Sequence, residues 1–178
     1  MILLPSINLI LSIAEMNLSK KSKTQGELSI VEFKEKYTKQ FTNLNFEWLE
    51  KYFYIEDYDR EVLTHPQKYI LDQGGTILFA LIGNDVIGTV ALIKRGEGVF
   101  ELSKMAVTEE FQGMKIGQKL MIACINFGKE RGWNRLFLDS NRKLKPAMNL
   151  YTKMGFVEIP VPEDSPYERC NIRMELIL

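Results

Sequence analysis

The chain has 178 residues, enough for one domain with a sizeable core but too few for a second domain of ordinary size. Lys and Arg (23) balance Asp and Glu (23), which argues against general binding to nucleic acid or to an anionic membrane surface. The two cysteines, Cys124 and Cys170, are too few for a disulfide framework and lack the spacing of zinc ligands. We therefore expect reduced thiols, no metal site and a cytoplasmic protein.

The first residues differ from the rest of the chain. Residues 1–14 are strongly apolar, but no basic residue precedes them as in a secretory signal, and the stretch is too short to span a bilayer. Residues 17–26 are polar and rich in lysine, which is typical of a linker. We interpret residues 1–26 as an N-terminal arm, either disordered or an extension ahead of a true start at Met16. A packing arm or a membrane-surface anchor is the alternative, and the folded domain is expected over 27–178.

The domain is predicted to begin with a strand and short helices. Apolar residues over 28–33 indicate the strand, and aromatic residues at helical spacing indicate a helix within 36–55. Asp59 opens a second short helix that ends near His65, because the residue before a proline is biased away from the helix. Another helical turn is expected at 69–71.

The middle and the end of the chain predict a sheet with crossing helices. Three strands separated by Gly-rich turns form a meander at 76–82, 86–94 and 99–107. The remaining elements follow in this order: a helix at 116–131, a strand at 136–140, a helix at 145–154, a strand at 156–159 and a strand at 170–178. This pattern predicts an α+β or mixed α/β domain, with a helical crossover if the strands at 99–107 and 136–140 are parallel. An exposed last strand would support a homodimer.

A glycine-containing loop follows the third strand of the meander. Residues 112–117 (QGMKIG) lie between the end of this strand and the start of a long helix. The N–H groups and the partial positive charge at a helix N-terminus suit a phosphate group, and glycine lets the backbone approach it. The loop is neither a Walker loop nor a dinucleotide-binding fingerprint. By itself it is equally consistent with a tight turn.

Together with two flanking motifs, this loop resembles the GNAT superfamily of acyl-CoA-dependent N-acyltransferases. The loop 112–117 is similar to the superfamily's Gln/Arg-x-x-Gly-x-Gly/Ala motif, and the strand 101–107 to its splayed fourth strand. Residues 147–156 match the superfamily's Ala-x-x-Leu-Tyr-x-x-x-Gly-Phe segment. The resemblance implies a central, mostly antiparallel twisted sheet that splays between strands four and five and is flanked by helices.

The resemblance also implies a function and a cofactor site. The expected activity is transfer of an acetyl group from acetyl-CoA to a primary amine of a small molecule or a protein, without a metal. The alternative is a non-catalytic acyl-CoA-binding sensor or interaction module. The residues expected to bind the cofactor are Met105, Ala106, Val107, Gln112, Gly113, Met114, Lys115, Ile116, Gly117, Gln118 and Asn141.

Two positions differ from the superfamily's pattern. Lys115 replaces a usual glycine, which predicts a helical backbone that needs no positive φ at this position. Its side chain would either add a positive charge at the pyrophosphate or point into solvent. The asparagine that usually precedes the third motif is replaced by Leu144, so Asn141 is expected either to reach the cofactor by another route or to form the turn.

The resemblance implies roles for two further residues. Tyr151 is the candidate acid that would protonate the CoA thiolate, and the alternative is a tyrosine that packs beside Leu150. Glu101 is the candidate base, acting directly or through a water, and the alternative is an exposed strand residue near Lys104.

The first helices carry the only sequence information on the acceptor. Their acidic and aromatic residues are Glu47, Trp48, Glu50, Tyr52, Tyr54, Glu56, Asp57, Tyr58 and Asp59. Such a wall would suit a cationic amine, but charges that merely solvate amphipathic helices are the plainer interpretation. His65 is interpreted as a turn residue.

Overall fold

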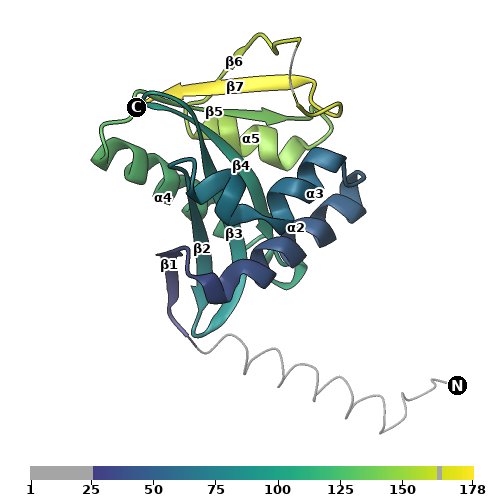
Figure 1. The fold of residues 1–178 in the computed structure, drawn as a ribbon, viewed down its shortest axis with the longest axis vertical. Coiled ribbons are helices and arrows are strands. Elements are labelled where there is room, and N and C mark those ends of the chain that lie inside the picture. The colour runs from purple at the N-terminus through teal and green to yellow at the C-terminus, as the bar shows by residue number, and fades with distance from the viewer. Residues whose placement is uncertain (1–25, 164–165) are drawn as a thin grey trace, which may run out of the picture.

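A seven-stranded sheet runs through the computed structural model, which describes residues 26–163 and 166–178 (Figure 1). Apart from Gly26, the predicted N-terminal arm lies outside the described residues. Within the described ranges, no helix is both long and apolar enough to cross a membrane.

The strands form a mixed sheet in the order β1-β2-β3-β4-β5-β7-β6. Their bounds are β1 Leu28–Glu32, β2 Thr76–Ile82, β3 Asp85–Gly96, β4 Val99–Val107, β5 Arg135–Ser140, β6 Val157–Ile159 and β7 Ile172–Ile177. Neighbouring strands are antiparallel except β4 and β5, which are parallel. The predicted mostly antiparallel α/β sheet is therefore confirmed.

The helices follow the predicted order. The α-helices are α2 Thr38–Tyr52, α3 Asp57–Thr64, α4 Ile116–Glu130 and α5 Lys145–Lys153. A 3-10 turn (Glu35–Tyr37) precedes α2, and a π-helical turn (Gln67–Leu71) follows α3. Helix α3 begins two residues earlier than predicted and ends before the His65-Pro66 step.

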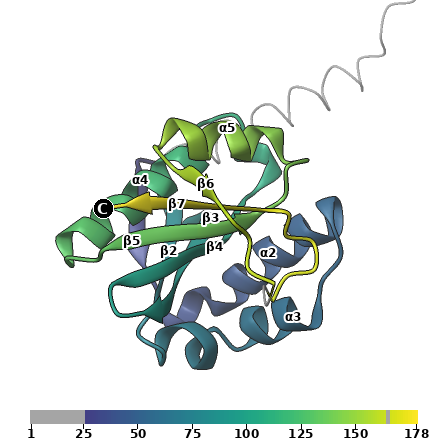
Figure 2. The ribbon, with the colours of Figure 1, turned by 90° about the horizontal axis from the view of Figure 1, so that it is seen from above.

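Helices cover both faces of the sheet (Figure 2). Side chains alternate along a strand, so Leu78 and Ala80 of β2 belong to the core under α4, whereas Ile77 and Phe79 belong to the core under α2 and α3. Burial on both faces explains why β2 is almost continuously apolar.

Strands β4 and β5 diverge after a short parallel pairing. Only the segments 99–101 and 135–137 pair, although β4 continues to Val107 and β5 to Ser140. Helix α4 forms the predicted crossover between them. A β-bulge in the β3–β4 ladder lies in the part of β4 that does not pair with β5, and Lys104 has a φ of 52° there. Such a bulge bends a strand, and here it accompanies the opening between β4 and β5.

The last strand is not an edge strand, so the expectation of an exposed final strand is wrong. Strand β7 pairs with β5 on one side and with the three-residue β6 on the other. The short β6 covers β7 because the chain returns to the sheet directly after α5. The predicted homodimer therefore loses this support.

Candidate active site

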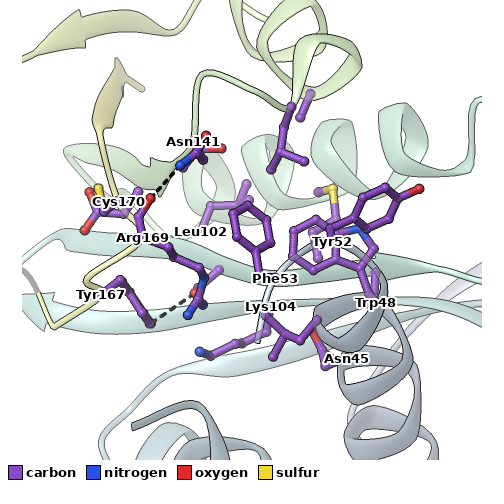
Figure 3. Close-up of a pocket in the computed structure, with 18 of the residues that line it drawn as sticks. Asn45, Trp48, Tyr52, Phe53, Leu102, Lys104, Asn141, Tyr167, Arg169 and Cys170 are labelled. Carbon is purple, nitrogen blue, oxygen red and sulfur yellow. Dashed lines mark hydrogen bonds between the residues drawn. The ribbon is translucent and has the colours of Figure 1, made fainter. Parts of the chain in front are cut away.

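A cavity of about 340 Å³ lies where β4 and β5 diverge (Figure 3). Its wall comes from β4, from the end of β5, from α2, from α5 and from the loop that precedes β7. The lining residues of β4 run from Leu102 to Val107. Because a strand without a neighbour has free backbone N–H and C=O groups, this edge can bind an extended ligand as an added strand.

Five of the predicted cofactor-binding residues line this cavity. They are Met105, Ala106, Val107, Gln112 and Asn141. The Gln112 side chain donates a hydrogen bond to the Val107 carbonyl at 3.2 Å and ties the loop to the end of β4. The other predicted residues, from Gly113 to Gln118, form the loop and the first turn of α4 beside the cavity.

The loop before α4 has a left-handed backbone at two residues. Gly113 has a φ of 81° and Lys115 a φ of 61°, so the helical backbone predicted for Lys115 is wrong. Lys115 is the residue that precedes α4, and the backbone turns there before the helix begins. The helical bonding of α4 starts with the Lys119 N–H, which leaves the N–H groups of the first turn available to an anion.

The first turn of α4 lies close to β4 and α5. A Cβ atom at Gly117 would lie 3.8 Å from Met105 Sδ and 3.9 Å from Leu150 Cδ2, both ordinary contacts. Ile116 is buried in the core under α4, whereas the Met114 side chain is half exposed. Ile116 therefore packs in the core, whereas Met114 belongs to the exposed part of the loop.

Asn141 has hydrogen bonds within the protein as well as a place at the cavity. Its side-chain amide donates to the Arg169 carbonyl at 2.7 Å, and its oxygen accepts from the Lys143 N–H at 2.9 Å. Asn141 therefore forms a turn and holds the loop before β7. Contact with the cofactor stays a prediction.

Tyr151 lines the cavity from α5. Burial raises the pKa of its phenol, and a hydrogen bond with Ser140 acts in the opposite direction. The phenol is therefore protonated at neutral pH, as a proton donor must be. The side chain also packs against the core, as the alternative interpretation expected.

Glu101 is buried in β4 but does not line the cavity. Arg95 donates to its carboxylate from Nε at 2.8 Å, and the Tyr167 hydroxyl donates to it at 3.3 Å. Tyr167 does line the cavity, so Glu101 is connected to it through this phenol. The alternative interpretation, an exposed strand residue, is wrong, and a role as base stays a prediction.

Sequence reasoning missed a buried charge cluster at the cavity. The carboxylate of Asp59, in α3, accepts hydrogen bonds from Lys104 Nζ at 2.7 Å and from Arg169 Nη1 at 2.6 Å. Burial alone would raise the pKa of Asp59, but the two cations outweigh it and the pKa is lowered. Burial also lowers the pKa of Lys104. Asp59 therefore does not face solvent, and its carboxylate is already paired with cations of the protein.

The other acidic residues of the first helices divide into two groups. Glu47, Glu50 and Asp57 are exposed, which agrees with charges that solvate a helix. Glu56 instead lies 2.9 Å from Arg169 Nη1. No sequence signal marked Arg169, because it comes from an irregular loop after three prolines. His65 lies at the end of α3 and does not line the cavity, as expected for a turn residue.

Among residues 26–163 and 166–178, no group of three or more His, Cys, Asp or Glu side chains has the geometry of a metal site. The described wall instead offers backbone groups, aromatic rings and paired charges.

Comparison with known proteins agrees with this geometry. The sequence profile of the Acetyltransferase (GNAT) family matches residues 38–156. The probable N-acetyltransferase camello of Xenopus tropicalis is 27% identical over 54% of this chain and 45% of the relative, so the chain spans less than half of that protein. The uncharacterised N-acetyltransferase YvbK of Bacillus subtilis is 28% identical over 57% of this chain and 67% of the relative.

Solved structures have the same fold. A GNAT acetyltransferase from Staphylococcus aureus Mu50 has a TM-score of 0.76 at 23% identity, covering 85% of this chain and 99% of the other. An acetyltransferase from Bacillus subtilis, solved in complex with CoA, has a TM-score of 0.65 at 21% identity, with coverage of 85% and 99%.

Proposed function

The chain belongs to the GNAT acetyltransferase family, and from this premise we propose that it transfers an acetyl group from acetyl-CoA to a primary amine. The observation that carries the proposal is the cavity between β4 and β5, which brings the free edge of β4 and Tyr151 to one wall, next to the start of α4. The transfer forms an N–C bond to the acetyl carbon and breaks the C–S bond. The amine loses a proton and the leaving thiolate gains one.

The backbone of this site supports binding of the donor. The N–H groups of the first turn of α4 suit a pyrophosphate, and the left-handed residues Gly113 and Lys115 turn the loop toward the helix start. The unpaired edge of β4 from Met105 to Val107 suits the amide groups of a pantetheine arm. An N–H group of the same edge would polarise the thioester carbonyl.

Tyr151 supports the chemical step. Its raised pKa keeps the phenol protonated, so it can give a proton to a thiolate that forms within the cavity. Ser140 of β5 lines the same cavity and acts to lower this pKa, against the larger effect of burial. The Tyr167 hydroxyl donates a hydrogen bond to Glu101. The amine would give its proton to the Tyr167 oxygen while Tyr167 gives its own proton to Glu101.

Thermal unfolding of the full chain with acetyl-CoA, CoA or ATP tests the donor site. A ligand present at about 100 times its Kd adds about 2.7 kcal/mol to the unfolding free energy. We expect stabilisation by acetyl-CoA and CoA but not by ATP. No stabilisation by acetyl-CoA would contradict the proposal. Turnover with an amine then separates an enzyme from the alternative, a non-catalytic acyl-CoA-binding module.

A further inference from the structure

The side chain of Asn45 faces the cavity with one polar atom still available. Asn45 lies in the middle of α2, is only 3% exposed and lines the cavity. Its side-chain amide donates to the Phe41 carbonyl at 2.9 Å, in its own helix. Among the residues that the structure describes, none donates a hydrogen bond to Asn45 Oδ1.

This oxygen is open to the cavity and not sealed in the core. In the described part of the chain, Thr89 Oγ1 is the single fully enclosed side-chain polar atom without a hydrogen-bond partner. Asn45 Oδ1 is therefore reached by solvent, and the cavity is what the side chain borders. A buried asparagine is unfavourable inside a helix unless its polar atoms are used. A ligand N–H group would satisfy this acceptor.

An aromatic surface surrounds this oxygen. Trp48 and Tyr52 lie three and seven positions after Asn45, on the same face of α2, and line the cavity with Phe53. The Trp48 ring centroid is 5.3 Å from that of Tyr52 and 5.6 Å from that of Phe53. Figure 3 shows these rings grouped beside Asn45. Rings packed at such distances form a wall for a flat apolar group.

The charges of the wall are already balanced by protein partners. The two carboxylates that line the cavity are those of Asp59 and Asp139. Asp59 accepts hydrogen bonds from Lys104 and Arg169. Asp139 accepts two hydrogen bonds from Arg173, each 2.6 Å long. A second ammonium group on a ligand would therefore find cations and not a free carboxylate.

Two rings that line the cavity, Phe53 and Tyr167, have protein cations over them. Lys143 Nζ lies 3.6 Å from the Phe53 centroid, and Lys104 Nζ lies 4.7 Å from the Tyr167 centroid. At these two rings, a protein cation already takes a position that a cationic ligand could use. The wall therefore disfavours a polyamine.

We propose that this wall is the acceptor subsite and that it takes a primary monoamine with an aromatic body. The inference rests on the proposed function and names its substrate class. The amine donates an N–H to Asn45 Oδ1, which leaves the nitrogen lone pair free for attack, and its body packs on Trp48, Tyr52 and Phe53. Asn45 is thus a positioning and specificity residue.

The test compares amines at saturating acetyl-CoA. The probes are 2-phenylethylamine, butylamine (no ring) and spermidine (additional cationic amines). We expect kcat/KM for 2-phenylethylamine to exceed the other two by about tenfold or more, the effect of burying one apolar group. A preference for spermidine or butylamine would overturn the inference, as would equal values for all three.

Asn45→Leu tests the hydrogen bond at similar side-chain volume. We expect the KM for 2-phenylethylamine to rise about tenfold, as for one lost hydrogen bond, while the KM for acetyl-CoA stays unchanged. Asn43→Leu is the matched control, because Asn43 is exposed on the same helix. An unchanged amine KM in Asn45→Leu would remove Asn45 from the subsite. If Asn45→Leu does not fold, the amine series on the unmodified chain decides the acceptor class.

The two proposals fail in different ways. Without stabilisation by acetyl-CoA, the proposed function fails. With stabilisation but no acetylation of 2-phenylethylamine, the donor site stands and the acceptor class is wrong.

Discussion

Lys104 Nζ lies 2.7 Å from Asp59 Oδ1, and both side chains are almost completely buried. The two residues are 45 positions apart and join the bulge of β4 to helix α3. Arg169 adds two hydrogen bonds to the same carboxylate, at 2.6 and 3.0 Å. One buried carboxylate therefore holds a strand, a helix and the loop before β7 around the cavity.

Removal of this carboxylate should destabilise the fold. Asp59→Asn leaves the buried Lys104 without its carboxylate and Arg169 with Glu56 alone, and we expect the unfolding free energy to fall by about 3–5 kcal/mol. Urea unfolding measures the change. The control is Asp57→Asn, at an exposed position of the same helix, where we expect a loss below about 1 kcal/mol. Equal losses in both variants would mean that the cluster contributes no special stability.

The contribution of Asp59 should depend on pH in one direction. Its pKa is lowered in the folded state, so the unfolded state binds the proton more readily as the pH falls. The stabilisation is therefore complete well above the ordinary aspartate pKa of about 3.9 and is lost as the pH falls through the folded value. We expect the difference between the unmodified chain and Asp59→Asn to be constant from about pH 6 to 8 and to shrink below about pH 4. A constant difference down to pH 2 would contradict this origin.

Two substitutions of Lys115 distinguish a role of its backbone conformation from a role of its side-chain charge. Its φ of 61° is favourable for glycine and strained for a β-branched residue. If the backbone matters, Lys115→Gly keeps the affinity for CoA, whereas Lys115→Val weakens it about tenfold through about 1–2 kcal/mol of strain. Calorimetric titration with CoA measures both variants. Equal weakening in both would instead indicate that the lysine charge contacts the pyrophosphate.

Tyr151→Phe tests the proton donor. We expect kcat to fall about 100-fold, because the thiolate loses its acid, while the affinity for acetyl-CoA changes little. Single-turnover kinetics and calorimetry separate the two quantities. Tyr69→Phe is the control, since Tyr69 does not line the cavity and its hydroxyl bonds to Glu61. A normal kcat in Tyr151→Phe would leave this residue with a packing role only.

Glu101→Gln tests the base by the shape of the pH–rate profile. If Glu101 receives the amine proton through Tyr167, the acid limb of kcat/KM flattens and the rate falls. If Glu101 only holds Arg95, the variant is less stable but keeps the profile of the unmodified enzyme. Glu97→Gln is the matched control, because Glu97 is exposed in the turn after β3. An unaltered profile at full folding would point to another proton acceptor.

Local patterns in the sequence were sufficient for most of the fold. Apolar periodicity predicted the helices and strands, and the Gly-rich turns predicted between the meander strands contain Gly83 and Gly98, which both have a positive φ. The helix predicted between β4 and β5 was the crossover that a parallel pair of these strands requires, and the resemblance implied that the two strands splay. The three motifs that carry the resemblance all lie on or beside the cavity. These features depend on residues close together in the chain.

Only the tertiary structure decided how distant residues are paired. The chain alone gives no sign that Asp59, Lys104 and Arg169 meet, that Glu101 lies under Tyr167, or that Asn45 has a free oxygen at the cavity. The left-handed backbone at Lys115 and the inner position of β7 also depend on contacts made after the sheet assembles. Spacing along a chain determines which side chains share a face of one element. The whole fold sets which element packs against that face, and with it the residues and charges that line the cavity.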